Sequence, residues 1–118
     1  MNQLDMQGRG AIVTGGAAGI GYAIAQRLAA SGARVSLWDR DASALQAAAK
    51  SLAADTHTHV LDVTSEDEVA GACEASIKAL GRVDALICSA GITGPNTTVQ
   101  QYPVAAWKEV LEINLTGV

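Results

Sequence analysis

Short apolar runs alternate along the chain with longer segments in which apolar residues recur every three or four positions. Brief apolar runs bounded by glycine or polar residues are typical of strands buried in a parallel sheet. Four runs fit this pattern: Gly10–Thr14, Arg34–Asp39, His57–Asp62 and Ala85–Cys88. We therefore predict four strands.

The segments between these runs have the periodicity of amphipathic helices. The predicted helices are Ile20–Ser31, Asp41–Ala53, a segment that Ser65 caps and Gly81 ends, and a last helix that starts at Pro103 and has no stop signal before Val118. Their predicted apolar faces are Ile20, Ile24 and Leu28; Ala44, Leu45, Ala48 and Leu52; Val69, Cys73, Ile77 and Leu80; and Val104, Trp107, Leu111 and Leu115.

The alternation of strands and helices decides the expected fold class. Four successive strand–helix pairs predict an α/β fold, a Rossmann-type doubly wound parallel sheet with helices on both faces. Right-handed crossovers between parallel strands then give the strand order 3-2-1-4. No repeat or linker interrupts the pattern, so residues 1–118 are expected to form a single domain.

Composition and charge narrow the range of functions. The content of 49% hydrophobic and 17% charged residues is that of a folded domain, and the net charge of -4 argues against a nucleic-acid surface. No apolar run could span a bilayer, and the polar segment Met1–Gly8 does not resemble a signal peptide. Cys73 and Cys88 have neither a disulfide pattern nor metal-ligand spacing, so we expect a cytoplasmic protein without a metal.

The segment Thr14–Gly21, with the sequence TGGAAGIG, joins the first predicted strand to the first predicted helix. Gly15 and Gly16 permit a tight turn, Gly19 allows the backbone to approach a pyrophosphate, and Gly21 lets the helix lie near the sheet. The helix N-terminus offers unpaired N–H groups to phosphates. The alternative is an ordinary strand-to-helix turn that happens to be rich in glycine.

The glycine spacing departs from G-x-G-x-x-G and resembles the short-chain dehydrogenase/reductase family, whose T-G-x-x-x-G-x-G turn is matched in full. The resemblance extends from Gly10 to Val118. It implies an NAD(P)-dependent oxidoreductase that transfers hydride between nicotinamide and an alcohol or carbonyl substrate, and that is often a homo-oligomeric dimer or tetramer. The cofactor contacts that it implies in the turn are Gly15, Ala18, Gly19, Ile20 and Gly21.

Asp39, at the end of the second predicted strand, bears on the choice of cofactor. A carboxylate there can accept hydrogen bonds from the adenosine ribose hydroxyls and would repel the 2′-phosphate of NADP. Arg40 favours NADP, because an arginine can accommodate the 2′-phosphate. Ala18 favours NAD, because relatives that prefer NADP often carry a basic residue at this position. We therefore expect NAD rather than NADP. The alternative for Asp39 is a helix cap before Asp41.

The resemblance implies two further contacts with the cofactor. Asp62 and Val63, at the end of the third predicted strand, would meet the adenine ring, with a helix N-cap region before Ser65 as the equal alternative for Asp62.

The fourth predicted strand leads into Cys88-Ser89-Ala90-Gly91, where the family usually has Asn-Asn-Ala-Gly. The resemblance places Cys88, Ala90 and Gly91 beside the cofactor. Cys88 cannot replace the donor and acceptor of an amide, which puts the side-chain support of this turn in question.

Asn114 lies in the last predicted helix among apolar neighbours. The resemblance assigns it to the catalytic tetrad, where it helps to hold a water in the proton relay. The alternative is a surface asparagine or one that bends the helix.

The family's Tyr-x-x-x-Lys pair is not found in these residues. Tyr22 is followed four positions later by Gln26, and Tyr102 by Ala106. We therefore expect a cofactor-binding N-terminal part of a longer enzyme, inactive by itself, with an unpaired apolar edge at the fourth strand. The alternative function is a non-catalytic NAD(P)-binding or sensing module.

Some conspicuous residues are not assigned to a site. His57 and His59 are expected to face solvent from a strand, and Trp38 and Trp107 to serve in packing.

Overall fold

The computed structural model describes residues 5–52 and 55–118, and within them four parallel strands form a sheet of order β3-β2-β1-β4. The strands are β1 (Gly10–Thr14), β2 (Arg34–Asp39), β3 (His57–Val60) and β4 (Ala85–Cys88). The register places Thr14 beside Trp38 on one side and beside Cys88 on the other. The predicted α/β class and strand order are confirmed.

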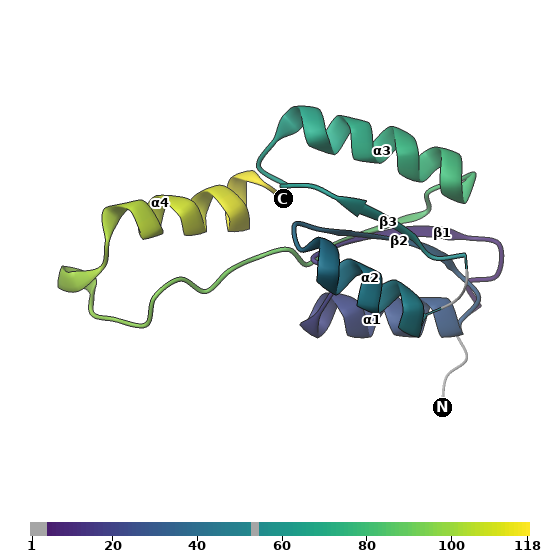
Figure 1. Ribbon diagram of the computed structural model, residues 1–118, viewed down its shortest axis with the longest axis horizontal. Helices are drawn as coiled ribbons and strands as arrows, with labels where there is room; N and C mark the ends of the chain where they lie inside the picture. The colour runs from purple at the N-terminus through teal and green to yellow at the C-terminus, as the bar shows by residue number, and fades with distance from the viewer. Residues whose placement is uncertain (1–4, 53–54) are drawn as a thin grey trace.

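Helices cover both faces of this sheet (Figure 1). The helices α1 (Gly19–Ala30) and α2 (Ala42–Ser51) lie on one face, and α3 (Glu66–Leu80) lies on the other. A short 3₁₀ turn, η1 (Val99–Gln101), precedes α4 (Val104–Leu111), which continues as a π-helical turn, η2 (Glu112–Thr116).

Two predicted boundaries require correction or comment. The third strand was expected to reach Asp62 but ends at Val60, because Leu61 and Asp62 lead into the turn before α3. The second helix was expected to reach Ala53 but ends at Ser51, and Ala53 itself lies outside the described residues.

The core beneath α1 and α2 is built from alternate residues of the central strands. Successive side chains of a strand point to opposite faces, so Val13, Val35 and Leu37 meet Leu45 and Ala48 of α2. In α1 the buried residues are Gly21 and Ala25, with Leu28 packed against them. The predicted inward position of Ile20 is wrong, because its side chain is 76% exposed at the end of the sheet.

The opposite core, beneath α3, contains Ile12, Trp38 and Leu61. Ala72 and Leu80 are the buried hydrophobic residues of α3, and Val69 and Cys73 are partly buried. Ile77, predicted to face inward, is 47% exposed. The residues of α3 that are buried against the sheet are Ala72, Ser76 and Leu80, which recur every four positions, and Trp38 belongs to the same cluster as Ala72 and Leu80.

A buried chain of polar side chains crosses this second core. Trp38 Nε1 donates to Ser76 Oγ at 2.9 Å, Ser76 Oγ lies 2.9 Å from Ser36 Oγ, and Ser36 Oγ lies 2.7 Å from His57 Nδ1. Ser36 and Ser76 are fully buried, so each hydroxyl needs such partners. The expectation that His57 faces solvent is therefore wrong, and burial together with the neighbouring His59 lowers the pKa of His57.

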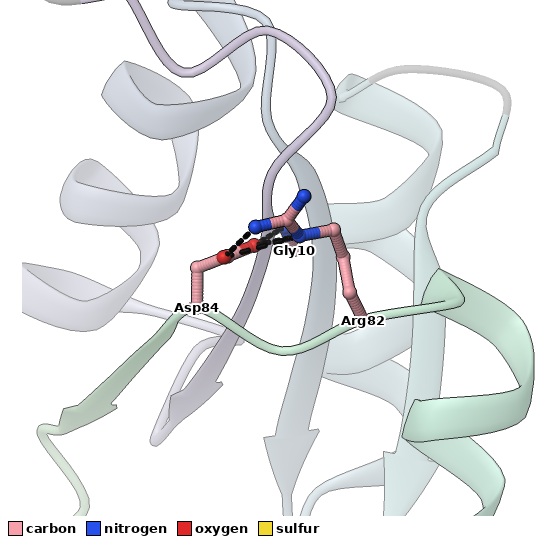
Figure 2. Close-up of polar contacts among 3 residues, drawn as sticks. All are labelled: Gly10, Arg82 and Asp84. Atoms are coloured by element: carbon pink, nitrogen blue, oxygen red, sulfur yellow. Dashed lines mark hydrogen bonds and ion pairs between the residues drawn. The ribbon is translucent and has the colours of Figure 1, made fainter.

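A polar clamp holds the starts of β1 and β4 together (Figure 2). The carboxylate of Asp84 accepts a hydrogen bond from the Gly10 N–H at 2.9 Å, and the Arg82 guanidinium pairs with the same carboxylate. These two partners lower the pKa of Asp84, Arg82 more than Gly10. A side chain on Gly10 would overlap the carbonyl oxygen of Arg82, so glycine is required for this approach.

The edge strand β4 and the last helix carry exposed apolar residues. Among the described strands β4 pairs with β1 alone, and Leu86 is 58% exposed. The predicted apolar face of α4 and η2 is also exposed, since α4 extends beyond the sheet (Figure 1). Trp107, expected to pack, is 57% exposed and makes an edge-to-face contact with Tyr102. No helix in the described part of the chain has the length and apolar character needed to cross a membrane.

Candidate functional site

A cleft opens at the carboxyl ends of the strands, where the segments that follow β1 and β4 leave the sheet. It consists of two adjoining hollows that share Gly15, Asp39, Ala90 and Gly91. The first hollow continues along Ala18, Gly19, Ile20, Gly21 and Ser89, and the second along Arg40, Leu61, Asp62, Val63, Ile92 and Ile113. Such a point in a doubly wound sheet is where small ligands bind.

The glycine turn is shaped by two left-handed residues. Gly15 has a φ of 63° and Gly19 a φ of 58°, which side chains with a Cβ rarely adopt. A side chain on Gly21 would overlap the carbonyl oxygen of Gly15, so the start of α1 can approach the turn closely. Nothing lies within 4 Å of the Cβ position of Gly19, which leaves the backbone there open to a ligand.

The N-terminus of α1 faces this opening without a competing group from its own helix. The N-cap residue Ala18 makes no side-chain cap bond, and the first turn of α1 contains no acidic residue. Unpaired N–H groups and the helix dipole favour an anion at such a position. The open glycine backbone and the uncapped helix together fit a diphosphate.

Asp39 places a carboxylate between the two hollows. Its Oδ2 accepts a hydrogen bond from the Ala17 N–H at 3.3 Å, and its Oδ1 accepts one from the Asp41 N–H at 3.1 Å. Asp41 is the residue that caps α2, since its side chain accepts from the Ala44 N–H. The alternative that Asp39 caps the helix is therefore ruled out.

Asp62 lies in the second hollow together with Arg40 and Val63. Its Oδ1 accepts hydrogen bonds from the hydroxyl and the N–H of Thr64, at 2.7 and 2.9 Å. These bonds, with a smaller contribution from the positive charge of Arg40, lower the pKa of Asp62. The N-cap of α3 is Ser65, so Asp62 does not have that role.

The turn after β4 is supported by Thr14, a role that the sequence analysis missed. Thr14 Oγ1 accepts hydrogen bonds from the N–H groups of Ser89 at 3.1 Å and Ala90 at 3.2 Å, and it donates to the Ile87 carbonyl at 3.4 Å. The feature of the sequence that could have indicated this role is the position of Thr14, immediately before the first glycine of the turn. The two asparagines that the family usually has in this turn are absent, and Thr14 provides hydrogen bonds that support the turn.

Cys88 lies apart from the other predicted cofactor residues. It lines a different hollow, on the α3 face of the sheet, with Trp38, Val69 and Thr116 among its neighbours. Alternation along β4 explains this placement, because Ile87 packs against the core beneath α1 and α2 and its neighbour Cys88 points the other way.

Asn114 belongs to the π-helical turn η2 and holds the wall of the cleft. Its Oδ1 accepts from the Ile92 N–H and its Nδ2 donates to the Ile92 carbonyl, both at 2.8 Å. The amide thus makes the pair of hydrogen bonds that a neighbouring strand would make. It fixes the chain just after Ala90 and Gly91.

The arrangement can bind and orient a dinucleotide. Donors from a helix terminus, the carboxylate of Asp39 and a shaped glycine backbone are present in one cleft. Within residues 5–52 and 55–118, no three His, Cys, Asp or Glu side chains come together as possible metal ligands.

Comparison with known proteins supports this interpretation. The sequence model of the family described as short chain dehydrogenase matches residues 9–118. A 2-dehydro-3-deoxy-L-rhamnonate dehydrogenase (NAD(+)) of Sphingomonas sp. (strain SKA58) is 49% identical over 93% of this chain and 44% of its own. The levodione reductase of Leifsonia aquatica is 36% identical over 91% of this chain and 42% of its own.

A solved structure shows the same fold over nearly the whole chain. The crystal structure of NAD+-bound xylitol dehydrogenase has a TM-score of 0.89 and 35% sequence identity, and the match covers 97% of this chain and 45% of that one. The chain thus spans less than half the length of these relatives. The family match, the T-G-x-x-x-G-x-G turn and the cleft beside it establish that the chain belongs to the short-chain dehydrogenase family.

Proposed function

We propose that the protein containing this chain is an NAD-dependent dehydrogenase or reductase, and that these residues form its cofactor-binding part. The observation that carries the proposal is the carboxylate of Asp39, which lies against the backbone of the glycine turn and borders both hollows of the cleft. The bound nicotinamide would supply the hydride that is exchanged with an alcohol or carbonyl group.

The residues present suit the successive parts of a dinucleotide. Gly15, Ala18, Gly19, Ile20 and Gly21 would hold the diphosphate, because their backbone is open and α1 begins there. Asp39 would accept hydrogen bonds from the adenosine ribose. The remaining assignments are Asp62 and Val63 for adenine, and Ala90 and Gly91 for the nicotinamide ribose; Cys88 would take part through its backbone.

The charge pattern favours NAD over NADP. The negative charge of Asp39 would lie close to a 2′-phosphate, and no basic side chain stands at Ala18 to offset it. Arg40 borders the hollow that also contains Asp39, but the carboxylate of Asp62 lies in the same hollow and interacts with the positive charge of Arg40. The relative named for NAD(+) and the NAD+-bound xylitol dehydrogenase support this choice.

Several of the relatives are named for small polar substrates. They include a sugar-acid dehydrogenase, a galactitol 2-dehydrogenase and a D-threitol dehydrogenase. We therefore place the substrate among polyols and hydroxy acids. In this scheme Asn114 positions the proton relay, and the acid–base group that accompanies hydride transfer belongs to the rest of the intact protein. The exposed apolar face of α4 supports a homo-oligomeric enzyme.

The test is to incubate the intact protein with NAD and a panel of polyols and sugar acids, and to follow NADH formation by absorbance. We expect NADH to form with at least one compound. The variant Asp39→Ala should need a higher NAD concentration for the same rate. Tight binding of NAD, with neither reduction of NAD by any member of the panel nor oxidation of NADH by the matching ketones, would contradict the proposal and favour a sensing module.

A further inference from the structure

The buried polar chain of the second core links the Trp38 indole to the His57 imidazole through two serine hydroxyls. An indole N–H can only donate, so Ser76 Oγ is the acceptor at that end of the chain. Two hydroxyl protons then remain for the two contacts from Ser76 to Ser36 and from Ser36 to His57. The state of His57 Nδ1 therefore decides in which direction the two hydroxyls donate.

Neutral and protonated His57 leave the buried hydroxyls in different states. With a bare Nδ1 on His57, Ser36 donates to it at 2.7 Å, and Ser76 donates to Ser36 at 2.9 Å. Protonated His57 has a hydrogen on Nδ1 and must donate to Ser36, so Ser36 must donate to Ser76 instead. The fully buried Ser76 hydroxyl then has no acceptor among the described residues, which is unfavourable for a buried donor.

The other end of the chain reaches the wall of the cofactor cleft. Trp38 directly precedes Asp39 at the end of β2, and its carbonyl accepts a hydrogen bond from the Gly16 N–H at 3.1 Å. The Asp39 carboxylate accepts a hydrogen bond from the Ala17 N–H at 3.3 Å. These two bonds tie the end of β2 to the glycine turn. A shift of the Trp38 indole would therefore displace the Asp39 carboxylate and the turn together.

The surroundings of His57 allow it to become protonated on acidification. His57 is partly exposed, so protons can reach its ring while Nδ1 is bound to Ser36. The elements packed against β3 are β2, α2 and α3. Their charged and titratable residues are Arg34 and Asp39 in β2, Lys50 in α2, and Cys73, Glu74, Lys78 and the acidic first turn in α3. Burial lowers the pKa of His57 most and the like charge of His59 lowers it further; none of the charges on the packed elements offsets these effects.

We infer that the polar chain is a proton-sensitive positioning device, in which neutral His57 holds the end of β2 in the arrangement that binds NAD and protonated His57 releases it. The inference rests on the proposed function and adds a form of regulation to it, because acidification would weaken cofactor binding through a residue that borders neither hollow of the cleft. Coupling between two bound ligands is reciprocal, so NAD should in turn make His57 harder to protonate.

The test measures the dissociation constant of NAD for the intact protein by calorimetric titration between about pH 5 and pH 8. We expect the constant to rise about fivefold as His57 becomes protonated. The titration of the His57 imidazole is followed in parallel by nuclear magnetic resonance, with and without NAD. The pKa of His57 should be lower in the NAD complex. This second measurement needs no substitution, so it decides the matter even where a variant does not fold.

Three variants locate the effect in the chain. His57→Gln should make the dissociation constant of NAD nearly independent of pH. Ser36→Ala should do the same although His57 still titrates, because the hydroxyl that joins His57 to Ser76 is gone. His59→Gln is the matched control. It should keep the rise in the dissociation constant but move it to higher pH, since it removes a like charge from the vicinity of His57.

The outcomes separate this inference from the proposed function. If the unsubstituted protein binds no NAD at any pH, the proposed function fails and the inference fails with it. If NAD binds with the same dissociation constant throughout and leaves the pKa of His57 unchanged, the function stands and the positioning device is wrong. A pH dependence that survives Ser36→Ala would also overturn the inference, because it would show that the charge of His57 does not act through the hydroxyls.

Discussion

The side-chain amide of Asn114 forms two hydrogen bonds with the backbone of Ile92, one to its N–H and one to its carbonyl, both at 2.8 Å. This pair joins the π-helical turn η2 to the segment that follows β4. Ile92 borders the cleft, so a residue 22 positions away in sequence determines where that wall stands. Asn114 can therefore affect cofactor binding without touching the cofactor.

The variant Asn114→Ala should lower both stability and affinity for NAD. It removes both bonds to Ile92, and we expect the free energy of unfolding to fall by about 1–2 kcal/mol. Urea unfolding and calorimetric titration of the intact protein measure the two effects. Asn114→Asp should be at least as harmful, because a carboxylate oxygen would replace the donor that faces the Ile92 carbonyl. Lys108→Ala, on the exposed surface of α4, is the control; equal results for it and Asn114→Ala would refute the role of Asn114.

The glycines at positions 10 and 71 should respond in opposite ways to the same substitution. A Cβ on Gly10 would overlap the backbone carbonyl oxygen of Arg82, so Gly10→Ala should lower the free energy of unfolding by about 3 kcal/mol. Gly71 lies in α3 with open space around it, and Gly71→Ala should raise the same quantity by about 0.5–1 kcal/mol. Denaturant unfolding of both variants checks this, and a loss of stability on Gly71→Ala would count against the described packing.

His57 should make stability depend on pH. Its pKa in the folded chain lies below the ordinary value of 6.5, because it is partly buried beside His59, so the unfolded chain binds more protons between the two values. The free energy of unfolding should therefore rise with pH through this window. The contribution is fully present above 6.5 and is lost as the pH falls through the folded pKa.

Urea unfolding between about pH 5 and pH 8 measures this dependence. The variant His57→Gln should flatten the curve across the window. His59→Gln should keep the rise but make it smaller, since it removes a like charge from the vicinity of His57. A His57→Gln curve as steep as that of the unsubstituted protein would show that the dependence comes from other groups.

The topology could be predicted from the sequence because it rests on local patterns. Each strand and helix has its own periodicity, and the handedness of the crossovers leaves little choice of order. The glycine turn and Asp39 were also recognisable, since their physical requirements depend on a few adjacent residues. Ser65 illustrates the same point, because a helix cap is decided within one turn.

The features that the sequence did not reveal depend on contacts between distant residues. The buried hydroxyl of Ser76 has its hydrogen-bond partners in Trp38 and Ser36, which belong to another element. The hydrogen bonds that Thr14 accepts from the turn after β4 depend on the register that places Thr14 beside Cys88. The direction of Cys88 follows from the same register, and the hydrogen bond of His57 follows from the pairing of β2 with β3.

The role of Asp39 in selecting NAD is tested most directly by titrating the intact protein and its Asp39→Ala variant with NAD and with NADP. We predict that the unsubstituted protein binds NAD more tightly than NADP, and that Asp39→Ala weakens NAD binding by about 10- to 100-fold while removing the preference for NAD. Asp67→Ala changes the charge equally on the exposed first turn of α3 and should preserve the preference. Tighter binding of NADP by the unsubstituted protein, or unchanged NAD binding by Asp39→Ala, would contradict this role of Asp39.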